Sequence, residues 1–455
     1  MTTVVHRSAD EIGRSAFGSR PLPPLDRYRT APQLSSVDTV LPNGLRGVAV
    51  RLASVPMAEL RLRIPLAGAH PGHRAFAELL AAGLMCGTAK RDRTRIYADL
   101  AALGGEVVAE VNPERLLISA SGLAETVPAL LDVVSEVIRT ATYPDALMEP
   151  ERTRLVQQMN LLRAQPARRA QAELRRHCYG DHPYARQLPS TSELEAAGIG
   201  QVRNLHAQAI VPRGSVVVLA GAHEPGHSVR LLADAFAAWD LAGTAGELPP
   251  LPPVAGGEVR LAEKAGATQA QIRLCAQAVP RHDPRYPALR LATQILGGSF
   301  SSRLMSNLRE RRGYTYSVRS SIEFTPGGAT VLVETDTANE VTAAALREIW
   351  AELDGLVLGP PSPAEIDEAR QYLIGTDLLS ASSQAGFASA ATATAAAGLT
   401  LDWLRTQPER LAAVTPAQVA DVAREYLSAD SFSGVVVGDS ELLADVAEVL
   451  PSYGC

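Results

Sequence analysis

The sequence predicts an α+β fold built from two related halves, each a mostly antiparallel sheet covered by helices. Three observations support this prediction. A segment rich in proline and glycine divides the chain, the same order of predicted elements occurs on both sides of it, and 455 residues suffice for two domains of roughly 200 residues each. The composition, 46% hydrophobic and 20% charged, is that of a globular protein with a substantial core.

The dividing segment is 241–257 (LAGTAGELPPLPPVAGG), whose proline and glycine content and single charge are typical of an interdomain linker. It separates a predicted N-terminal domain, 37–240, from a predicted C-terminal domain, 258–455. Residues 1–36 precede the first strand signal and contain the sequence PLPP at 21–24, which favours an extended N-terminal arm.

The first half begins with a predicted β-hairpin, because Asn43-Gly44 lies between two apolar runs and this dipeptide suits a two-residue turn. Residues 59–66 (ELRLRIPL) alternate between polar and apolar side chains, which predicts a half-buried strand. Further periodic patterns predict helices at 76–86, 95–103, 125–139 and 225–239, and strands at 106–111, 116–120 and 215–219.

The second half repeats this order of elements. Its patterns predict strands at 271–278, 314–323, 329–334 and 433–437, and helices at 286–296, 303–311, 340–356 and 441–450. Equivalent elements recur at a spacing of roughly 210 residues, which indicates an internal duplication. The uncharged stretch 378–401 consists mostly of Ala, Ser, Thr and Gly; it is too weakly apolar for a membrane span and predicts a closely packed helix.

Charge and cysteine content exclude several classes of protein. The formal net charge is −6, without long runs of one sign, so no nucleic-acid partner is expected. Four widely spaced cysteines form no Cys-x-x-Cys motif and no disulfide framework, which suits a reducing compartment. The N-terminus lacks a basic segment followed by an apolar one, so we expect a cytoplasmic protein without a membrane anchor.

The segment 295–318 (ILGGSFSSRLMSNLRERRGYTYSV) carries a family resemblance. It resembles the C-terminal repeat of the pitrilysin- and insulysin-type zinc peptidases, a family that includes mitochondrial processing peptidase. The matching features are a Gly-Gly turn, Ser302-Arg303-Leu304, Leu308-Arg309, Gly313 and Tyr316-Ser317. In that family the residues matching Arg309 and Tyr316 reach the peptide at the zinc site, where a guanidinium and a phenol can hold the backbone and stabilise a developing oxyanion.

The same resemblance implies a zinc motif, His-x-x-Glu-His, on a helix of the first half. The matching positions here are Glu78, Ala81 and Ala82. The family's third ligand is a glutamate further along the chain, and the matching position is Gln158, although the preceding family glutamate is present as Glu151. Because alanine cannot coordinate zinc and a neutral amide is a poor ligand for it, we expect no metal and no other cofactor in this chain.

A second zinc pattern, His-Glu-x-x-His, occurs at 223–227. It requires both histidines on one helical turn, whereas Pro225 and Gly226 follow directly after a predicted strand. Proline is favoured in the first turn of a helix, so we expect His223 to precede the helix and point away from His227. An autonomous zinc peptidase that uses these two histidines is therefore the least favoured interpretation.

The resemblance and the lost ligands together lead to one main hypothesis. The chain resembles the α-type, non-zinc subunit of processing peptidase in a bacterial heterodimer, in which a homologous subunit carries the zinc and the substrate is a short or unfolded peptide. Arg309 and Tyr316 would then act on that peptide in trans, and this chain alone would be inactive. The alternative is a non-catalytic structural or peptide-binding protein of the same fold.

Overall fold

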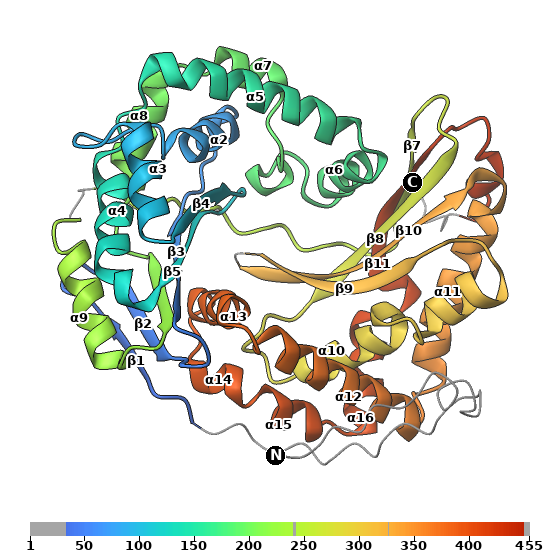
Figure 1. The fold of residues 1–455 in the computed structure, drawn as a ribbon. Coiled ribbons are helices and arrows are strands. Elements are labelled where there is room, and N and C mark those ends of the chain that lie inside the picture. Colours follow the sequence, from blue (N-terminus) through green and yellow to red (C-terminus); the bar gives the residue numbers. More distant parts are fainter. Residues whose placement is uncertain (1–32, 240–242, 326, 450–455) are drawn as a thin grey trace, which may run out of the picture.

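The computed structural model describes residues 33–239, 243–325 and 327–449. The predicted N-terminal arm, 1–36, lies almost entirely outside these ranges, and the first strand begins at its end, with Ser36. Figure 1 shows two sheets with their helices, one in the blue-to-green half of the chain and one in the yellow-to-red half.

The first half contains every strand and helix predicted for it, with small shifts at the ends, and four further helices, α5 to α8. In chain order the elements are β1 (Ser36–Val40), β2 (Arg46–Arg51), β3 (Met57–Pro65), α2 (His73–Gly83), α3 (Arg93–Ala102), β4 (Glu106–Val111), β5 (Arg115–Leu123), α4 (Val127–Thr140), α5 (Asp145–Ala164), α6 (Pro166–Tyr179), α7 (Thr191–Ala196), α8 (Ile199–Ala209), β6 (Val216–Gly221) and α9 (Pro225–Phe236).

The second half contains β7 to β11 and the remaining helices. They are β7 (Val259–Glu263), β8 (Gln269–Ala278), α10 (Tyr286–Thr293), the π-helical turns η3 (Gln294–Gly298) and η4 (Met305–Arg311), β9 (Val318–Thr325), β10 (Gly328–Ala338), α11 (Thr342–Leu358), α12 (Pro363–Ser380), α13 (Gln384–Ala396), α14 (Leu401–Arg405), α15 (Gln407–Ala412), α16 (Pro416–Tyr426) and β11 (Phe432–Gly438).

The two sheets have the same topology. The first has the strand order β1-β2-β6-β3-β5-β4 and the second the order β7-β11-β8-β10-β9. In each, the strand that closes the half pairs in parallel with its outer neighbour, β6 with β2 and β11 with β7, while the other pairs are antiparallel. Without β1 the two orders match strand for strand, which agrees with the predicted internal duplication and confirms the α+β class with mostly antiparallel sheets.

The predicted hairpin at Asn43-Gly44 connects β1 and β2. Gly44 has φ = +87°, a left-handed conformation that favours glycine. The Asn43 amide donates hydrogen bonds to the carbonyl oxygens of Phe236 and Trp239, at 2.9 and 3.1 Å, so this turn also fixes the end of α9. Asn43, which marks the turn in the sequence, therefore also makes a long-range contact.

Each half contributes one helix to the sheet of the other half. Helix α6 packs on β8 and β11, and its Ala170 and Leu174 lie in a buried cluster with Leu332 and Val437 of the second sheet. The ion pair between Arg175 and Glu323, at 2.7 Å, fastens α6 to the strand β9.

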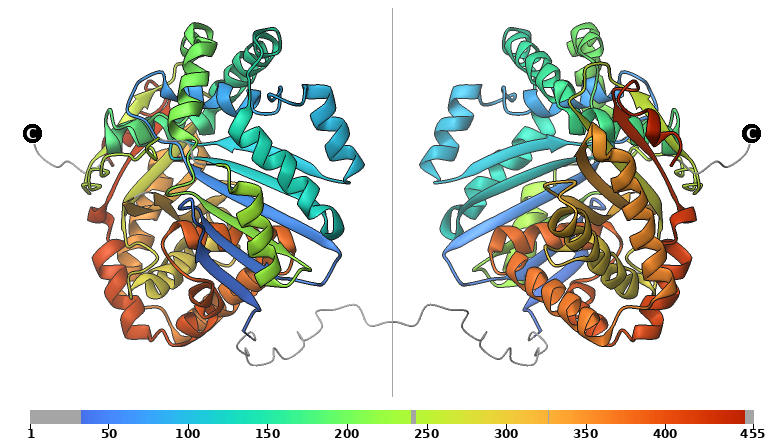
Figure 2. Two further views of the ribbon diagram at one scale, coloured as in Figure 1. Left: turned by 90° about the vertical axis from the view of Figure 1, so that its left-hand side faces the viewer. Right: turned by 90° about the vertical axis from the view of Figure 1, so that its right-hand side faces the viewer.

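The reciprocal helix, α13, packs on β3 and β6 of the first sheet. Figure 2 shows the orange helices of the second half beside the blue strands of the first. Phe387 and Ala391 of α13 share a buried cluster with Val48 and Val218. Arg46 of β2 donates hydrogen bonds to the carbonyl oxygens of Ala395 and Leu399, so the two halves are joined by exchanged helices as well as by the linker.

Two of the predicted helices differ from the structure. The stretch 378–401 is interrupted, because Ser383 accepts a hydrogen bond from Gly386 N and caps a new helix, α13, after α12 has ended at Ser380. Over 441–449, the described part of the predicted helix 441–450, the chain forms turns around a short 3₁₀ segment, Ala444–Val446. Its buried residues, Leu443 and Val446, are three positions apart, a spacing that a 3₁₀ turn places on one face. In the described ranges no helix is long and apolar enough to cross a membrane.

A buried histidine in the first half gives a testable pH dependence of stability. The Tyr143 hydroxyl lies 2.7 Å from Nδ1 of His206, and burial lowers the pKa of His206 from 6.5 to about 4. Above pH 6.5 neither state is protonated, whereas between about 6.5 and 4 the unfolded chain binds a proton that the folded chain cannot bind. The free energy of unfolding should therefore fall by about 2 kcal/mol between pH 7.5 and pH 5 because of this residue alone.

Urea unfolding of the wild type and of His206→Gln at these two pH values isolates the contribution. The variant loses the Tyr143 contact at both pH values, but its drop in unfolding free energy between them should be about 2 kcal/mol smaller than that of the wild type. Equal drops in the two proteins would show that His206 does not titrate as its burial implies.

Candidate functional site

Helix α2 carries the three positions that match the family zinc motif: Glu78, Ala81 and Ala82. The Glu78 carboxylate accepts a hydrogen bond from Arg74 Nη2 at 2.6 Å, one helical turn earlier, and both side chains are largely buried. Burial raises the pKa of Glu78, and the Arg74 charge opposes that rise. The first ligand position is therefore occupied by a structural ion pair within the helix.

The other two positions of the motif, Ala81 and Ala82, line a cavity of about 600 Å³ between α2, α3, β4 and α5. Glu151 of α5 lies in the same cavity and contacts two arginines, Arg93 at 3.2 Å and Arg154 at 2.8 Å. Two guanidinium groups beside one carboxylate repel a cation, and the alanines offer no donor atom. The residues here do not fit a zinc ion, which needs thiolate, imidazole or carboxylate ligands.

Gln158, at the third ligand position, lies on the exposed side of α5 and accepts a hydrogen bond from Arg154 Nη1 at 3.2 Å. The structure therefore brings Ala81, Ala82 and Glu151 together, while Glu78 and Gln158 contact arginines of their own helices. Within the described ranges, no three His, Cys, Asp or Glu side chains are grouped so as to hold a metal ion.

The second zinc pattern spans the start of α9. The helix begins at Pro225 with Glu224 as its N-cap, so His223 precedes the helix and His227 lies in the first turn, as the position of the proline predicts. The two imidazole centroids are 5.6 Å apart, with the rings tilted by 44°. Glu224, which this pattern would use as the general base, pairs with Arg51 at 3.2 Å. The expectation that His223 points away from His227 is therefore wrong, although only His227 lies in the helix and the two do not share the helical turn that the pattern requires.

Arg309 and Tyr316 lie next to each other in the second half. The Arg309 guanidinium carbon is 4.9 Å from the centroid of the Tyr316 ring and 4.7 Å from that of Phe300, so two aromatic rings contact it. Its acidic contact is the adjacent Glu310, at 3.3 Å. Gly313, with φ = +67°, reverses the chain between the two residues. The pair is thus assembled by a turn and by stacking.

Tyr316 lies in a loop and not in the strand predicted for 314–323, because β9 begins only at Val318. The Thr315 hydroxyl fixes this loop by donating a hydrogen bond to Asp336 O at 2.7 Å. The Tyr316 side chain is 84% exposed, and no hydrogen bond within the described ranges engages its hydroxyl. Its phenol is therefore free to donate to a ligand.

A cavity of about 670 Å³ lies beside Tyr316, along the edge of the second sheet and the start of α6. Its charged side chains are paired: buried Arg273 contacts Asp336 at 2.8 Å, and Arg319 contacts Glu334 at 2.7 Å. These pairs form a fixed polar wall. Tyr316 lines this cavity and Arg309 contacts the Tyr316 ring, so a phenol and a guanidinium beside the cavity can donate hydrogen bonds, which suits carbonyl or carboxylate oxygens.

Phe300 is the residue of this site that the sequence did not single out. It stands in the Gly-Gly-containing turn and is 62% exposed, yet it packs against Arg309. An aromatic residue between serines in a predicted turn was the one available signal, because such residues are commonly placed for contact with a ligand or a neighbouring side chain.

Comparison with known protein families gives two adjacent matches. Residues 76–192 match the model described as Insulinase (Peptidase family M16), and residues 198–373 match the model described as Peptidase M16 inactive domain. Glu78, Ala81 and Ala82 of α2 and the Arg309–Tyr316 segment lie inside the matched ranges.

Curated relatives and solved structures agree with these matches. An uncharacterized zinc protease of Mycobacterium leprae is 27% identical over 297 residues, covering 64% of this chain and 67% of the relative, and one of Streptomyces coelicolor is 28% identical, covering 62% and 63%. This last alignment spans less than two thirds of the relative.

Solved structures have the same fold. A peptidase M16 inactive domain from Pseudomonas fluorescens gives a TM-score of 0.82 at 23% identity, and the match covers 89% of this chain and 98% of that one. A protease from Helicobacter pylori gives a TM-score of 0.81 at 16% identity, with 89% and 99% coverage.

Proposed function

Since this chain belongs to the M16 (insulinase) family of peptidases, we propose that it is the non-zinc subunit of a heterodimeric peptidase. The observation that carries this proposal is an asymmetry between its two halves. Arg309 and Tyr316 are stacked and accessible, whereas Ala81 and Ala82 face a cavity where Glu151 is neutralised by arginines. The chain keeps donors for a peptide and lacks the residues for a metal.

In this proposal, Arg309 and Tyr316 act on a peptide held at the zinc site of a homologous partner subunit. A guanidinium and a phenol near a peptide carbonyl bind its oxygen more strongly in the transition state, when the oxygen becomes negatively charged, than in the neutral ground state. They therefore lower the barrier to hydrolysis. Phe300 limits the motion of the guanidinium and reduces the entropy lost on binding. The substrate is a short or unfolded peptide, whose backbone is accessible to these donors.

The proposal is tested by reconstitution. The isolated chain should contain no stoichiometric zinc by elemental analysis and should hydrolyse none of a panel of short unstructured peptides. Mixed with a homologous subunit that has an intact His-x-x-Glu-His motif, it should form a complex that cleaves these peptides and is inhibited by a chelator. A partner variant with the motif glutamate changed to glutamine is the matched control, since it should assemble without activity.

Two outcomes decide against the proposal. Stoichiometric zinc together with peptide hydrolysis in the isolated chain would mean that it is an autonomous peptidase, and His227→Ala would then identify the pattern at the start of α9 as its site. Peptide binding without a zinc-bearing partner, and without activity in any mixture, would favour the non-catalytic alternative that shares this fold.

A further inference from the structure

A cavity of about 600 Å³ lies where the two halves meet, and we call it the junction cavity. Arg63 and Arg115 reach it from β3 and β5 of the first sheet, and Phe324 from the end of β9 in the second. Arg281 and His282, in the loop after β8, and small residues at the end of α13 complete its walls. A ligand here would contact both halves at once.

The junction cavity has an excess of positive charge. Three arginines and a histidine line it, and none of its lining residues is acidic. Within the described ranges, Arg63, Arg115, Arg281 and His282 take part in no ion pair. The whole chain has a formal net charge of −6, so this local accumulation does not follow from the composition.

Several polar groups of the cavity are desolvated without a partner. Nε of Arg63 and the hydroxyl of Thr325 are buried and make no hydrogen bond. The Arg281 guanidinium lies 3.9 Å from the centroid of the Phe324 ring. Burial lowers the pKa of Arg63, as does the like charge of Arg115. Like charges held together away from water are costly, and an anion between them would relieve that cost.

One buried carboxyl group, Glu114, interacts with Arg63 and Arg115 from outside the cavity. Glu114 precedes Arg115 and is only 8% exposed, but it does not line the cavity and forms no ion pair within the described ranges. Burial raises the pKa of Glu114 to about 7, while the charges of Arg63 and Arg115 oppose that rise. Glu114 thus offsets part of their charge from outside the cavity, and no carboxylate among the described lining residues pairs with them inside it.

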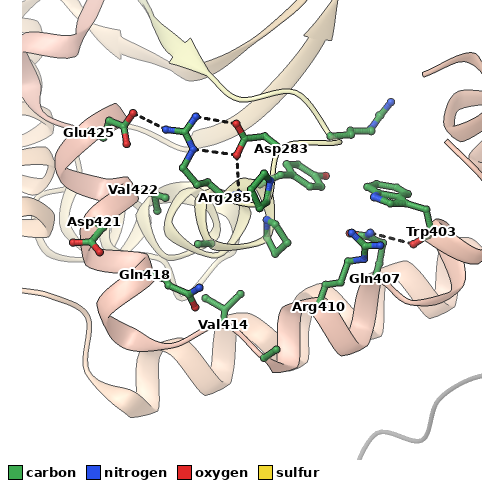
Figure 3. Close-up of a pocket in the computed structure, with 16 residues that line it drawn as sticks. Asp283, Arg285, Trp403, Gln407, Arg410, Val414, Gln418, Asp421, Val422 and Glu425 are labelled. Carbon is green, nitrogen blue, oxygen red and sulfur yellow. Dashed lines mark hydrogen bonds and ion pairs between the residues drawn. The ribbon is translucent and has the colours of Figure 1, made fainter. Parts of the chain in front are cut away.

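A neighbouring cavity contains an arginine that is paired with two carboxylates. Arg285, four residues after Arg281, donates to Asp283 at 2.8 Å and to Glu425 at 2.7 Å (Figure 3). Both carboxylates belong to the same cavity, whose volume is about 480 Å³. Arg281 lines both cavities, so the contrast lies in Arg63 and Arg115, which meet no carboxylate among the described residues that line the junction cavity.

We propose that the junction cavity binds a carboxylate of a peptide ligand, either its C-terminal carboxylate or an Asp or Glu side chain. The inference rests on the proposed function, in that it takes a peptide as the ligand. Arginine donors in a fork bind a carboxylate through two hydrogen bonds, and the side chains of Arg63 and Arg115 line the cavity from neighbouring strands. A volume of this size accommodates the end of a peptide, and the two sheets hold the donors in place.

The test measures equilibrium binding by the full-length chain alone. The probe is an N-terminally fluorescein-labelled decapeptide of Gly, Ser and Ala with one Glu near a free C-terminus, followed by fluorescence anisotropy. We expect saturable binding below about 1 mM. One peptide is amidated at its C-terminus, and a second has its Glu changed to Gln. The Kd should rise about tenfold or more for the peptide that lacks the carboxylate bound by the cavity, so the comparison shows which carboxylate binds.

Protein variants provide the second arm of the test. Arg115→Gln should raise the Kd about tenfold or more, whereas Arg285→Gln, a matched control in the neighbouring cavity, should leave it unchanged. Thermal unfolding of both variants checks that they are folded. If Arg115→Gln does not fold, Arg281→Gln replaces it.

The proposal is overturned if the wild type does not bind the peptide or if neither peptide change weakens binding. It is also overturned if the control variant weakens binding as much as Arg115→Gln, or if inorganic phosphate binds while the peptides do not. Because no partner subunit is present, these outcomes are independent of the reconstitution.

Discussion

Arg309→Ala should lower kcat/KM of the reconstituted heterodimer by about 100- to 1000-fold while leaving assembly intact. This is the range for removal of one donor that stabilises a developing oxyanion. The guanidinium contacts the rings of Phe300 and Tyr316 and the exposed carboxylate of Glu310, so its removal exposes no buried partner. The loss should therefore appear in the chemical step and not in the stability of the subunit.

Three further variants separate the role of Arg309 from that of positive charge in general. Arg309→Lys keeps the charge but loses the planar group that contacts two aromatic rings, so it should restore only part of the activity. Tyr316→Phe keeps the ring and removes the hydroxyl, so it should cost about tenfold or more. Arg311→Ala, at the same helix end and exposed, is the matched control. If Arg309→Ala and Arg311→Ala behave alike, the pair has no role in catalysis.

Most of the sheet strands and their covering helices could be predicted, because they depend on local patterns, whereas α5 to α8, β7, α12 and α14 to α16 were not predicted. Alternation along β3, the Asn43-Gly44 turn and the helical periods each constrain a few consecutive residues. The parallel pairing of β2 with β6 has no local signal, since the strands are far apart in sequence and their apolar runs fit several neighbours. Helix α13 was predicted from its small residues, but those residues do not specify that the first sheet covers it.

For the candidate site, too, some residues could be identified from the sequence, whereas their tertiary contacts could not. The resemblance identified Arg309 and Tyr316, because their spacing and surrounding residues form one continuous segment. The stacking of Phe300 on Arg309 and the gathering of Arg63 with Arg281 depend on tertiary contacts, which a single sequence does not show. The loss of zinc ligands was visible residue by residue, whereas the two arginines that neutralise Glu151 were visible only in the structure.

The second large effect is expected at the ion pair that fastens α6 to the second sheet. Arg175 and Glu323 are 15% and 25% exposed in their side chains, and the Tyr184 hydroxyl donates to the same carboxylate oxygen at 3.2 Å. Arg175→Met leaves Glu323 without its cation in a largely buried position, which costs about 3–5 kcal/mol in such pairs. The free energy of unfolding, measured with urea at pH 7.5, should fall by an amount in this range.

Two controls establish whether the cost arises from an unpaired buried charge. The double variant Arg175→Met/Glu323→Leu removes both charges and should recover most of the loss, because apolar replacements of a buried pair are often close to neutral. Arg424→Ala breaks an exposed ion pair with Asp421 and should cost less than about 1 kcal/mol. If Arg175→Met costs no more than Arg424→Ala, α6 is held by its apolar contacts alone. A large cost would instead mean that this one ion pair holds α6 in its position on the second sheet. The first turn of α6 lines the cavity beside Tyr316, so loss of the pair would also change the geometry of the site.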